Sequence, residues 1–315
     1  MDQKVVIVGV GIAGAVHARV LQDFPGVAVV AGIDTSVRSL TFRGTKIPVY
    51  PSLFDMTADT ELQPDIVVVA TPTPAHARAC GEVAEYFGRA SIIVEKPAAG
   101  NLEDARRIVC GIGGKQPVAV AYHMAFSPVV EWGVAETARR AEQLGTPVAI
   151  DAWAADPYQS NLVSARERLT DSWTDSGINA LSVMERFVKP VARTSLRQIG
   201  TREESVFEGT FRCVAGGTQL PATVVTSWYT TERSRWIRIR YSSGAELVLD
   251  LHAVTGYMRQ DGRTSAMFGT DGTTPRREAH YRGLYTSWLG LGRRDQIFSA
   301  DTSMRLHKLL LGDGA

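Results

Sequence analysis

The stretch KVVIVGVGIAG, residues 4–14, decides the fold of the N-terminal part of the chain. KVVIV, residues 4–8, is a short β-branched run, which predicts a buried strand. Gly9, Gly11 and Gly14 then match G-x-G-x-x-G, and GAVHARVLQDF after them predicts a helix. A strand, a glycine turn and a helix in this order predict a dinucleotide site, because the turn lets backbone N–H groups at the helix N-terminus approach a pyrophosphate.

A second sign of a dinucleotide site is Asp34, which ends the next apolar run, VAVVAGID. A carboxylate at this spacing accepts hydrogen bonds from the adenosine ribose and repels a 2′-phosphate, so it favours NAD. Arg38 and Arg43 follow and could bind that phosphate, which leaves NADP as an alternative. The simpler interpretation is a glycine turn with a capping aspartate and solvated arginines. We expect cofactor contacts from Gly9, Gly11, Ile12, Ala13, Gly14, Asp34 and Arg38.

Beyond Asp34 the pattern predicts an α/β architecture followed by a different one. Apolar runs at 65–71, 91–97 and 117–123 alternate with helical patterns at 76–88 and 102–114, which is typical of a parallel sheet covered on both faces. After residue 122 a helix at 128–143 precedes strands with polar alternation and two hairpins, 235–251 and 257–268. The expected fold is a Rossmann doubly wound sheet, residues 1–121, and an α+β domain with a large open, mostly antiparallel sheet, residues 122–315. The last helix is expected to pack back on the first domain.

Composition excludes several classes of protein. The 315 residues carry a net charge of +1, which gives no electrostatic case for nucleic acid or a membrane as partner. Cys80, Cys110 and Cys213 are far apart without a C-x-x-C, so neither disulfides nor a metal site is expected. The N-terminal apolar run is short and broken by glycines, so we expect a cytoplasmic protein without a leader.

Two further motifs follow strands of the expected parallel sheet. TPTPAH, residues 71–76, and EKPAAG, residues 95–100, stand at carboxyl ends of strands, where open α/β sheets bind ligands. Lys96 could serve there as an acid or base, although a surface lysine is an equal alternative.

A third candidate site is WTDSGINALSVMERFV, residues 173–188. Asp175 and Ser176 are helix-capping residue types, and Asp175 and Asn179 share a helix face if the helix begins here. Simple capping by Asp175 is the alternative.

Taken together, GVGIAG, Asp34, TPTPAH and EKP resemble the Gfo/Idh/MocA oxidoreductases over nearly the whole chain. The resemblance implies hydride transfer on sugars or related substrates, with Lys96 beside the nicotinamide. It places further cofactor positions at Thr71, Pro72, His76, Glu95 and Pro97. It also implies a homodimer or homotetramer formed through the C-terminal sheet, and the Trp236, Arg238 and Arg240 face suits such an interface.

The closest resemblance in motif is to the galactose and arabinose 1-dehydrogenase branch. Many family members have D-x-x-x-H, but here Asn179 replaces the histidine, and an amide cannot take up a proton. The implied catalytic residues are Lys96, Asp175 and Asn179, and the implied substrate contacts also include His123, Trp153 and Tyr281. Met124 and Ala125 stand where the family has an arginine, so an imine or keto reductase is a second reading. A non-catalytic dinucleotide sensor is a third.

Overall fold

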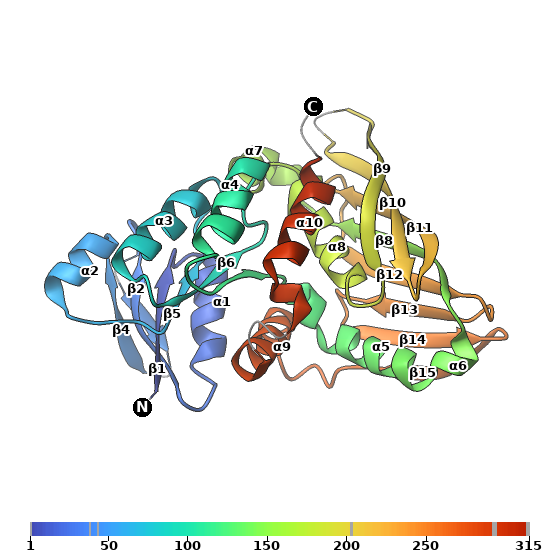
Figure 1. Cartoon of the computed structure of the whole chain (residues 1–315), viewed down its shortest axis with the longest axis horizontal. Helices are drawn as coiled ribbons and strands as arrows, with labels where there is room; N and C mark the ends of the chain where they lie inside the picture. The colour runs from blue at the N-terminus through green and yellow to red at the C-terminus, as the bar shows by residue number, and fades with distance from the viewer. Residues whose placement is uncertain (1, 38, 43, 202–203, 292–294, 313–315) are drawn as a thin grey trace. The chain divides into compact units, whose positions relative to one another are not determined.

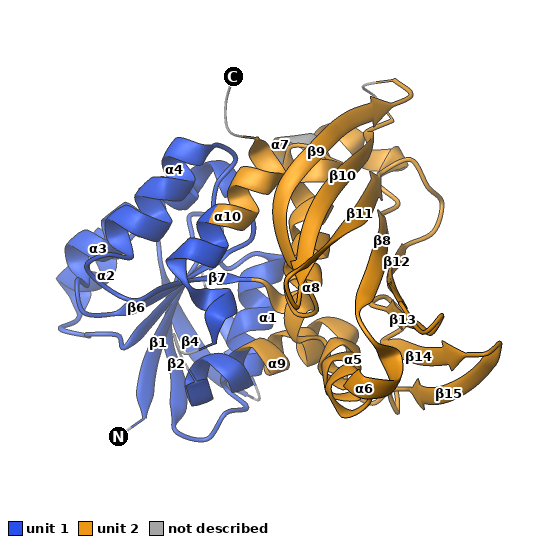
Figure 2. Ribbon diagram, turned by 45° about the vertical axis from the view of Figure 1, so that its right-hand side comes forward, with its two compact units in different colours: residues 1–121, 285–304 blue, residues 122–284, 305–315 orange. Residues whose placement is uncertain are grey.

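The computed structural model describes residues 2–37, 39–42, 44–201, 204–291 and 295–312. The chain forms two compact units, drawn in different colours in Figure 2. Unit 1 contains residues 1–121 and 285–304, and unit 2 contains residues 122–284 and 305–315. Unit 1 is therefore built from two separate stretches of chain. Within the described residues, no helix combines the length and apolar character needed to cross a membrane.

Unit 1 contains a seven-stranded sheet in the order β3-β4-β2-β1-β5-β6-β7 (Figure 1). Its neighbouring strands are parallel except for β3 and β4, which form an antiparallel edge hairpin. The central strands β1 and β5 are buried, as their apolar runs predict. The strands are β1 (Gln3–Val8), β2 (Val27–Ile33), β3 (Ser39–Phe42), β4 (Thr45–Tyr50), β5 (Ile66–Val69), β6 (Ser91–Glu95) and β7 (Val118–Ala121).

The helices of unit 1 connect successive parallel strands, so the predicted Rossmann-type sheet is confirmed. The predicted helix 102–114 is in fact a short α-helix that continues as a π-helix over Arg107–Ile112. The helical segments are α1 (Ile12–Leu21), α2 (Leu53–Asp59), η1 (Thr73–Ala75), α3 (His76–Tyr86), α4 (Leu102–Arg106), η2 (Arg107–Ile112) and η7 (Gln296–Phe298).

Unit 2 contains an eight-stranded sheet in the order β15-β14-β13-β12-β8-β11-β10-β9. Among the strands that the structure describes in unit 2, only the β8–β11 pair is parallel, so the predicted mostly antiparallel sheet is confirmed. The hairpin at Asp261–Gly262 turns through two residues of positive φ, 51° and 71°, which is the two-residue turn that suits the strand twist. The strands are β8 (Pro147–Ala155), β9 (Lys189–Ile199), β10 (Val206–Ala215), β11 (Thr218–Ser227), β12 (Ser234–Tyr241), β13 (Glu246–Asp250), β14 (Thr255–Gln260) and β15 (Arg263–Phe268).

Helices cover one face of the unit 2 sheet. Helix α8 contacts β8 and β9, and α5 contacts β13 and β14. Side chains of β8 alternate, so buried Ala152 faces these helices whereas Asp151 and Trp153 belong to the other face. The helical segments are η3 (His123–Phe126), α5 (Pro128–Arg139), α6 (Ala141–Leu144), η4 (Gln159–Asn161), α7 (Leu162–Leu169), η5 (Trp173–Gly177) and α8 (Ile178–Met184). Helices α9 (Arg276–Leu291) and α10 (Ala300–Leu311) each contribute residues to both units.

Candidate functional site

In the glycine turn of unit 1, backbone segments approach so closely that there is no room for a side chain at Gly9 or Gly14. Gly9 has φ +88°, and a Cβ built on it would lie 2.7 Å from the backbone of Ala70 at the end of β5. A Cβ on Gly14 would lie 1.9 Å from the Gly9 carbonyl oxygen, so helix α1 packs directly against the turn. Gly11 differs, because a Cβ there meets nothing within 4 Å. The turn therefore leaves open space in front of its second glycine.

Asp34 holds this turn in place. Its Oδ2 accepts a hydrogen bond from the Val10 N–H at 2.8 Å, and its Oδ1 accepts from the N–H groups of Ser36 and Val37. The carboxylate thus fixes both the glycine turn and the chain after β2. Ile12 is 68% exposed in the first turn of α1. Arg38 and Arg43 lie outside the described residues.

The TPTPAH and EKP loops are joined by His76. The imidazole is buried, and its Nε2 lies 2.8 Å from the Thr71 carbonyl oxygen. Its Nδ1 lies 3.1 Å from the Pro97 carbonyl oxygen and 3.2 Å from that of Ala98. Burial lowers the pKa of His76, while these carbonyl groups act in the opposite direction. His76 therefore links the ends of β5 and β6 through contacts with the chain itself.

A buried polar network fixes the residue before Lys96. Glu95 Oε1 lies 2.9 Å from His17 Nε2, and Glu95 Oε2 accepts a hydrogen bond from the Lys96 N–H at 3.0 Å. His17 Nδ1 contacts the hydroxyl of Tyr285, 268 residues away in the chain. Burial and the nearby Glu95 charge hold the pKa of Tyr285 well above its usual value. The sequence analysis missed His17, although it lies three residues after the last motif glycine.

In unit 2, Asp175 and Asn179 are both buried at the junction of η5 and α8. Asn179 Nδ2 donates to the Asp175 carbonyl oxygen at 3.2 Å, and Asn179 Oδ1 has no hydrogen-bond partner within the described part of the chain. The structure does not support the alternative in which Asp175 merely caps a helix. Asp175 and Ser176 both lie inside the helical turn of η5, because the helical structure starts earlier, and Ser176 instead contacts Asp156.

An aromatic group lies at the start of α9 and at η3. His123 stacks on Tyr281 with ring centroids 4.6 Å apart, and its ring lies 6.0 Å from that of His280. All three residues are buried. Burial, followed by repulsion from His123, Arg276 and Arg235, holds the pKa of His280 well below its usual value. The structure therefore groups the predicted substrate residues His123 and Tyr281 within one unit.

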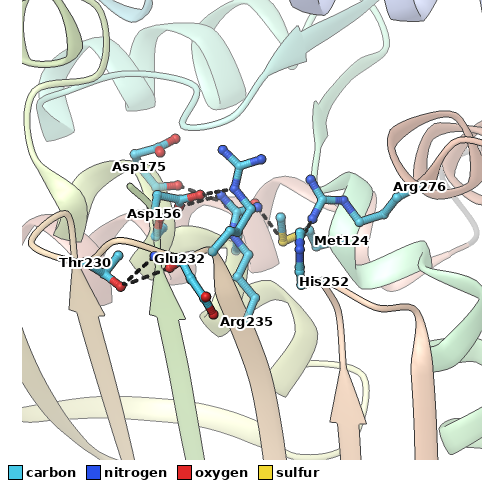
Figure 3. A network of polar contacts seen from close by, with 11 residues as sticks. Met124, Asp156, Asp175, Thr230, Glu232, Arg235, His252 and Arg276 are labelled. Carbon is cyan, nitrogen blue, oxygen red and sulfur yellow. Dashed lines mark hydrogen bonds and ion pairs between the residues drawn. The ribbon is translucent and has the colours of Figure 1, made fainter. Parts of the chain in front are cut away.

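A buried charge cluster of unit 2 was missed by the sequence analysis. Asp156, fully buried just after β8, pairs with Arg233 Nε and with Arg235 at 2.6 Å each (Figure 3). Burial raises the pKa of Asp156, but the two guanidinium groups outweigh burial, so the pKa lies below its usual value. The available signal was an aspartate ending the apolar strand AWAAD and two arginines in RSRW.

Trp153 lines a small cavity together with Asn179 and Arg235, so its substrate contact stays a prediction. Strand alternation places its side chain with Asp151 and, by register, with Trp236, on the face opposite to α8. Among the described residues there is no group of three or more His, Cys, Asp or Glu side chains that could hold a metal ion.

Comparison with known proteins identifies the first unit. Residues 3–121 match the family model described as GFO_IDH_MocA, an oxidoreductase family with an NAD-binding Rossmann fold. Residues 3–121 are therefore similar to the NAD-binding Rossmann domain of this oxidoreductase family.

Solved structures extend the likeness in fold to nearly the whole chain. An oxidoreductase from Agrobacterium radiobacter in complex with NAD+, L-tartaric acid and magnesium is 14% identical, with TM-score 0.74 over 98% of this chain and 94% of that chain. UDP-N-acetylglucosamine 3-dehydrogenase GnnA from Acidithiobacillus ferrooxidans is 17% identical, with TM-score 0.72 over 99% and 97%. A myo-inositol dehydrogenase from Corynebacterium glutamicum is 18% identical, with TM-score 0.69 over 98% and 95%. No curated protein sequence matched the chain.

The residues at the glycine turn and at the end of β5 fit NAD, which the matching family binds. The open space at Gly11 is where a pyrophosphate needs to approach the backbone. The Thr71 hydroxyl at the end of β5 is buried without a hydrogen-bond partner among the described residues, as expected of a group that a ligand completes.

Proposed function

We propose that this protein transfers hydride between the nicotinamide of NAD and a carbon of a sugar or sugar-like substrate that carries a hydroxyl or carbonyl group. The observation that carries the proposal is the placement of Lys96. It follows β6, at the same sheet edge as the glycine turn and Thr71, on a loop fixed by His76 and Glu95. A lysine positioned this firmly beside a dinucleotide turn suits proton transfer better than a solvated surface role.

Each proposed residue has a chemical role. Bound NAD supplies the hydride acceptor or donor. Lys96 Nζ takes the proton from the substrate oxygen in oxidation, or returns it in reduction. Asp175 is proposed to tune or relay that proton, whereas Asn179, whose amide cannot carry a proton, is proposed to bind a substrate hydroxyl. His123 and Tyr281 are proposed as further substrate contacts.

A sugar-like substrate is supported by two kinds of similarity. Two proteins with this fold are a myo-inositol dehydrogenase and a UDP-N-acetylglucosamine 3-dehydrogenase. The D-x-x-x-N pattern of Asp175 and Asn179 resembles the galactose and arabinose 1-dehydrogenase branch. We propose oxidation of a sugar hydroxyl as the main direction.

The test compares wild type with Lys96→Ala, with Lys115→Ala as the matched control at an exposed lysine. NADH formation is followed with NAD+ and galactose, arabinose or myo-inositol. Lys96→Ala should lower kcat about a hundred- to ten-thousandfold and leave NADH affinity roughly intact, because general acid–base catalysis contributes on that order. Asp175→Asn should lower kcat and shift the pH profile. Equal turnover by Lys96→Ala and the control would refute the proposed role of Lys96.

Met124 motivates a second candidate, an imine or keto reductase, because it replaces the arginine usual in the family. NADH consumption with a cyclic imine and with keto sugars separates this reductase from the sugar dehydrogenase. Saturable NADH binding without turnover in either direction would instead indicate a dinucleotide sensor.

We also propose assembly through the open face of the unit 2 sheet, as a homodimer or homotetramer. This face carries Trp153 and Trp236 side by side in register, next to the Arg238–Asp151 ion pair of 2.8 Å. Tryptophan and arginine are enriched at protein interfaces. Light scattering at micromolar concentration tests this proposal, and a monomeric mass would contradict it.

A further inference from the structure

Arg233, Arg235 and Arg276 outnumber the two carboxylates whose charges act on Arg235. Asp156 is shared by Arg233 and Arg235, and Asp175 is a second carboxylate close enough to raise the pKa of Arg235. Arg276, the first residue of α9, adds a third guanidinium to these two carboxylates. Figure 3 shows Arg276 reaching toward the cluster beside His252.

Arg276 has no carboxylate within ion-pair distance among the described residues. Its guanidinium contacts Nδ1 of His252, a neutral acceptor. The side chain is half-buried, and burial, with repulsion from Arg235, Arg233 and Arg277, lowers the pKa of Arg276 to about 10. Burial and Arg276 lower the pKa of His252 as well, and they outweigh the opposing charge of Asp250, so His252 is neutral at pH 7.

Two buried nitrogen atoms in the same region lack hydrogen-bond partners within the described part of the chain. They are Nε of Arg235 and Nε2 of His280. His280 is only 1% exposed, and Arg276 and Arg235 both act on its pKa. Guanidinium groups that converge on a half-buried region without enough carboxylates are costly unless an anion joins them.

We propose that Arg276 and Arg235 form a subsite for an anionic group of the substrate, a carboxylate or a phosphate. The inference rests on the proposed function in that it specifies the substrate of that enzyme as an acidic or phosphorylated sugar. A guanidinium binds either group through two parallel hydrogen bonds, which a neutral sugar does not reproduce.

Anion binding is measured first, independently of turnover. Inorganic phosphate and malonate are titrated into wild type, Arg276→Gln and Arg276→Lys at constant ionic strength set with potassium chloride. Arg263→Gln, at an exposed arginine of β15, is the matched control. Arg276→Gln should weaken anion binding roughly ten- to a hundredfold, because hydrogen bonds to charged groups contribute on that order. The anion affinity of Arg276→Lys should lie between those of Arg276→Gln and wild type.

The unfolding temperature is a second measurement. If Arg276 only stabilised the fold, Arg276→Gln would lower the Tm, whereas an anion subsite predicts the opposite. Without added anion, Arg276→Gln should unfold at the same temperature as wild type or higher, since it removes one of three repelling cations. Phosphate should raise the Tm of wild type and of Arg263→Gln but leave that of Arg276→Gln unchanged. A lower Tm for Arg276→Gln, with no anion effect on wild type, would overturn the proposal.

Turnover then distinguishes the two anions and separates this inference from the proposed function. Galactose, galacturonate and galactose 6-phosphate are compared at saturating NAD+. One charged sugar should have the lowest KM, and Arg276→Gln should raise that KM far more than it changes kcat. Arg276-dependent anion binding without turnover of any sugar would support the anion subsite but contradict the proposed sugar dehydrogenase activity. Equal KM values for all three sugars, unchanged in Arg276→Gln, would contradict the anion subsite but not the dehydrogenase activity.

Discussion

Replacing Glu95 by glutamine tests the buried network that fixes Lys96. The two carboxylate oxygens of Glu95 face two groups, His17 Nε2 at 2.9 Å and the Lys96 N–H at 3.0 Å. Glutamine has nearly the same size but only one acceptor oxygen, because its other position is an NH2 donor. The variant therefore cannot accept from both groups.

The imidazole of His17 can adapt only in part. If the oxygen of the introduced amide accepts from Lys96, the amide NH2 donates to Nε2, and the imidazole proton moves to Nδ1. Nδ1 then donates to the Tyr285 oxygen, and the Tyr285 hydroxyl proton loses its acceptor. Tyr285 and His17 are both 0% exposed, so no water compensates this loss. One unsatisfied buried donor costs about 1–3 kcal/mol, which is the expected decrease in the free energy of unfolding.

Urea unfolding of wild type and Glu95→Gln measures this difference. Glu82→Gln, at a half-exposed glutamate of α3, is the control and should change stability by less than about 0.5 kcal/mol. NADH affinity and kcat should also fall in Glu95→Gln, since the backbone at Lys96 loses a fixed partner. If Glu95→Gln is as stable as the control, the carboxylate does not hold these two donors and the reasoning is wrong.

Four further outcomes are expected. Gly11→Val should fold, since a Cβ there meets nothing within 4 Å, yet lose NADH binding in a fluorescence titration because it fills the pyrophosphate space. Asp34→Ala should narrow the preference for NADH over NADPH in the same titration, and should lower the Tm because the carboxylate also holds Val10. Asp156→Asn should lower the free energy of unfolding by about 3–5 kcal/mol at pH 7, because Arg235 is left buried without its charged partner. Trp236→Glu should shift the mass measured by light scattering toward the monomer.

The Asp156 prediction has a defined pH dependence. The pKa of Asp156 is lower in the folded protein than its unfolded value of about 3.9, so its stabilisation is complete above that pH. The stabilisation disappears as the pH falls through the folded pKa, where wild type protonates Asp156 and approaches the asparagine variant. If the difference in unfolding free energy between wild type and Asp156→Asn stays constant from pH 7 to pH 3, this account is contradicted.

Two results would contradict the cofactor predictions. Tighter binding of NADPH than of NADH by wild type would contradict the role of Asp34. NADH binding by folded Gly11→Val would contradict the pyrophosphate contact.

Local signals in the sequence were sufficient for much of the fold. The apolar run before Gly9 and the positions of the motif glycines predict β1, the turn and α1 because the whole pattern lies within one continuous stretch, residues 3–21. The hairpin at Asp261–Gly262 is predicted for the same reason. The edge strands β3 and β4 were missed, since their short, partly polar segments carry no comparable pattern.

The polar networks could not be predicted because tertiary structure alone brings their members together. Asp156 meets Arg233 and Arg235 across 77 and 79 residues. That meeting depends on the register of β8 against β12, which residue types do not encode. Strand register likewise pairs Trp153 with Trp236, a neighbour that the residue types alone did not indicate.

The construction of unit 1 from two stretches of chain has a consequence for how the protein is made. A ribosome adds about 5–20 residues per second, so residues 285–304 follow residue 121 only after roughly 8–33 s. During that interval His17 lacks Tyr285, and the nascent dinucleotide domain is incomplete while unit 2 is being synthesised. A nascent chain stalled after residue 121 should therefore retain little NADH and be cut readily by protease, whereas one stalled with residues 285–304 outside the ribosome should resist cleavage.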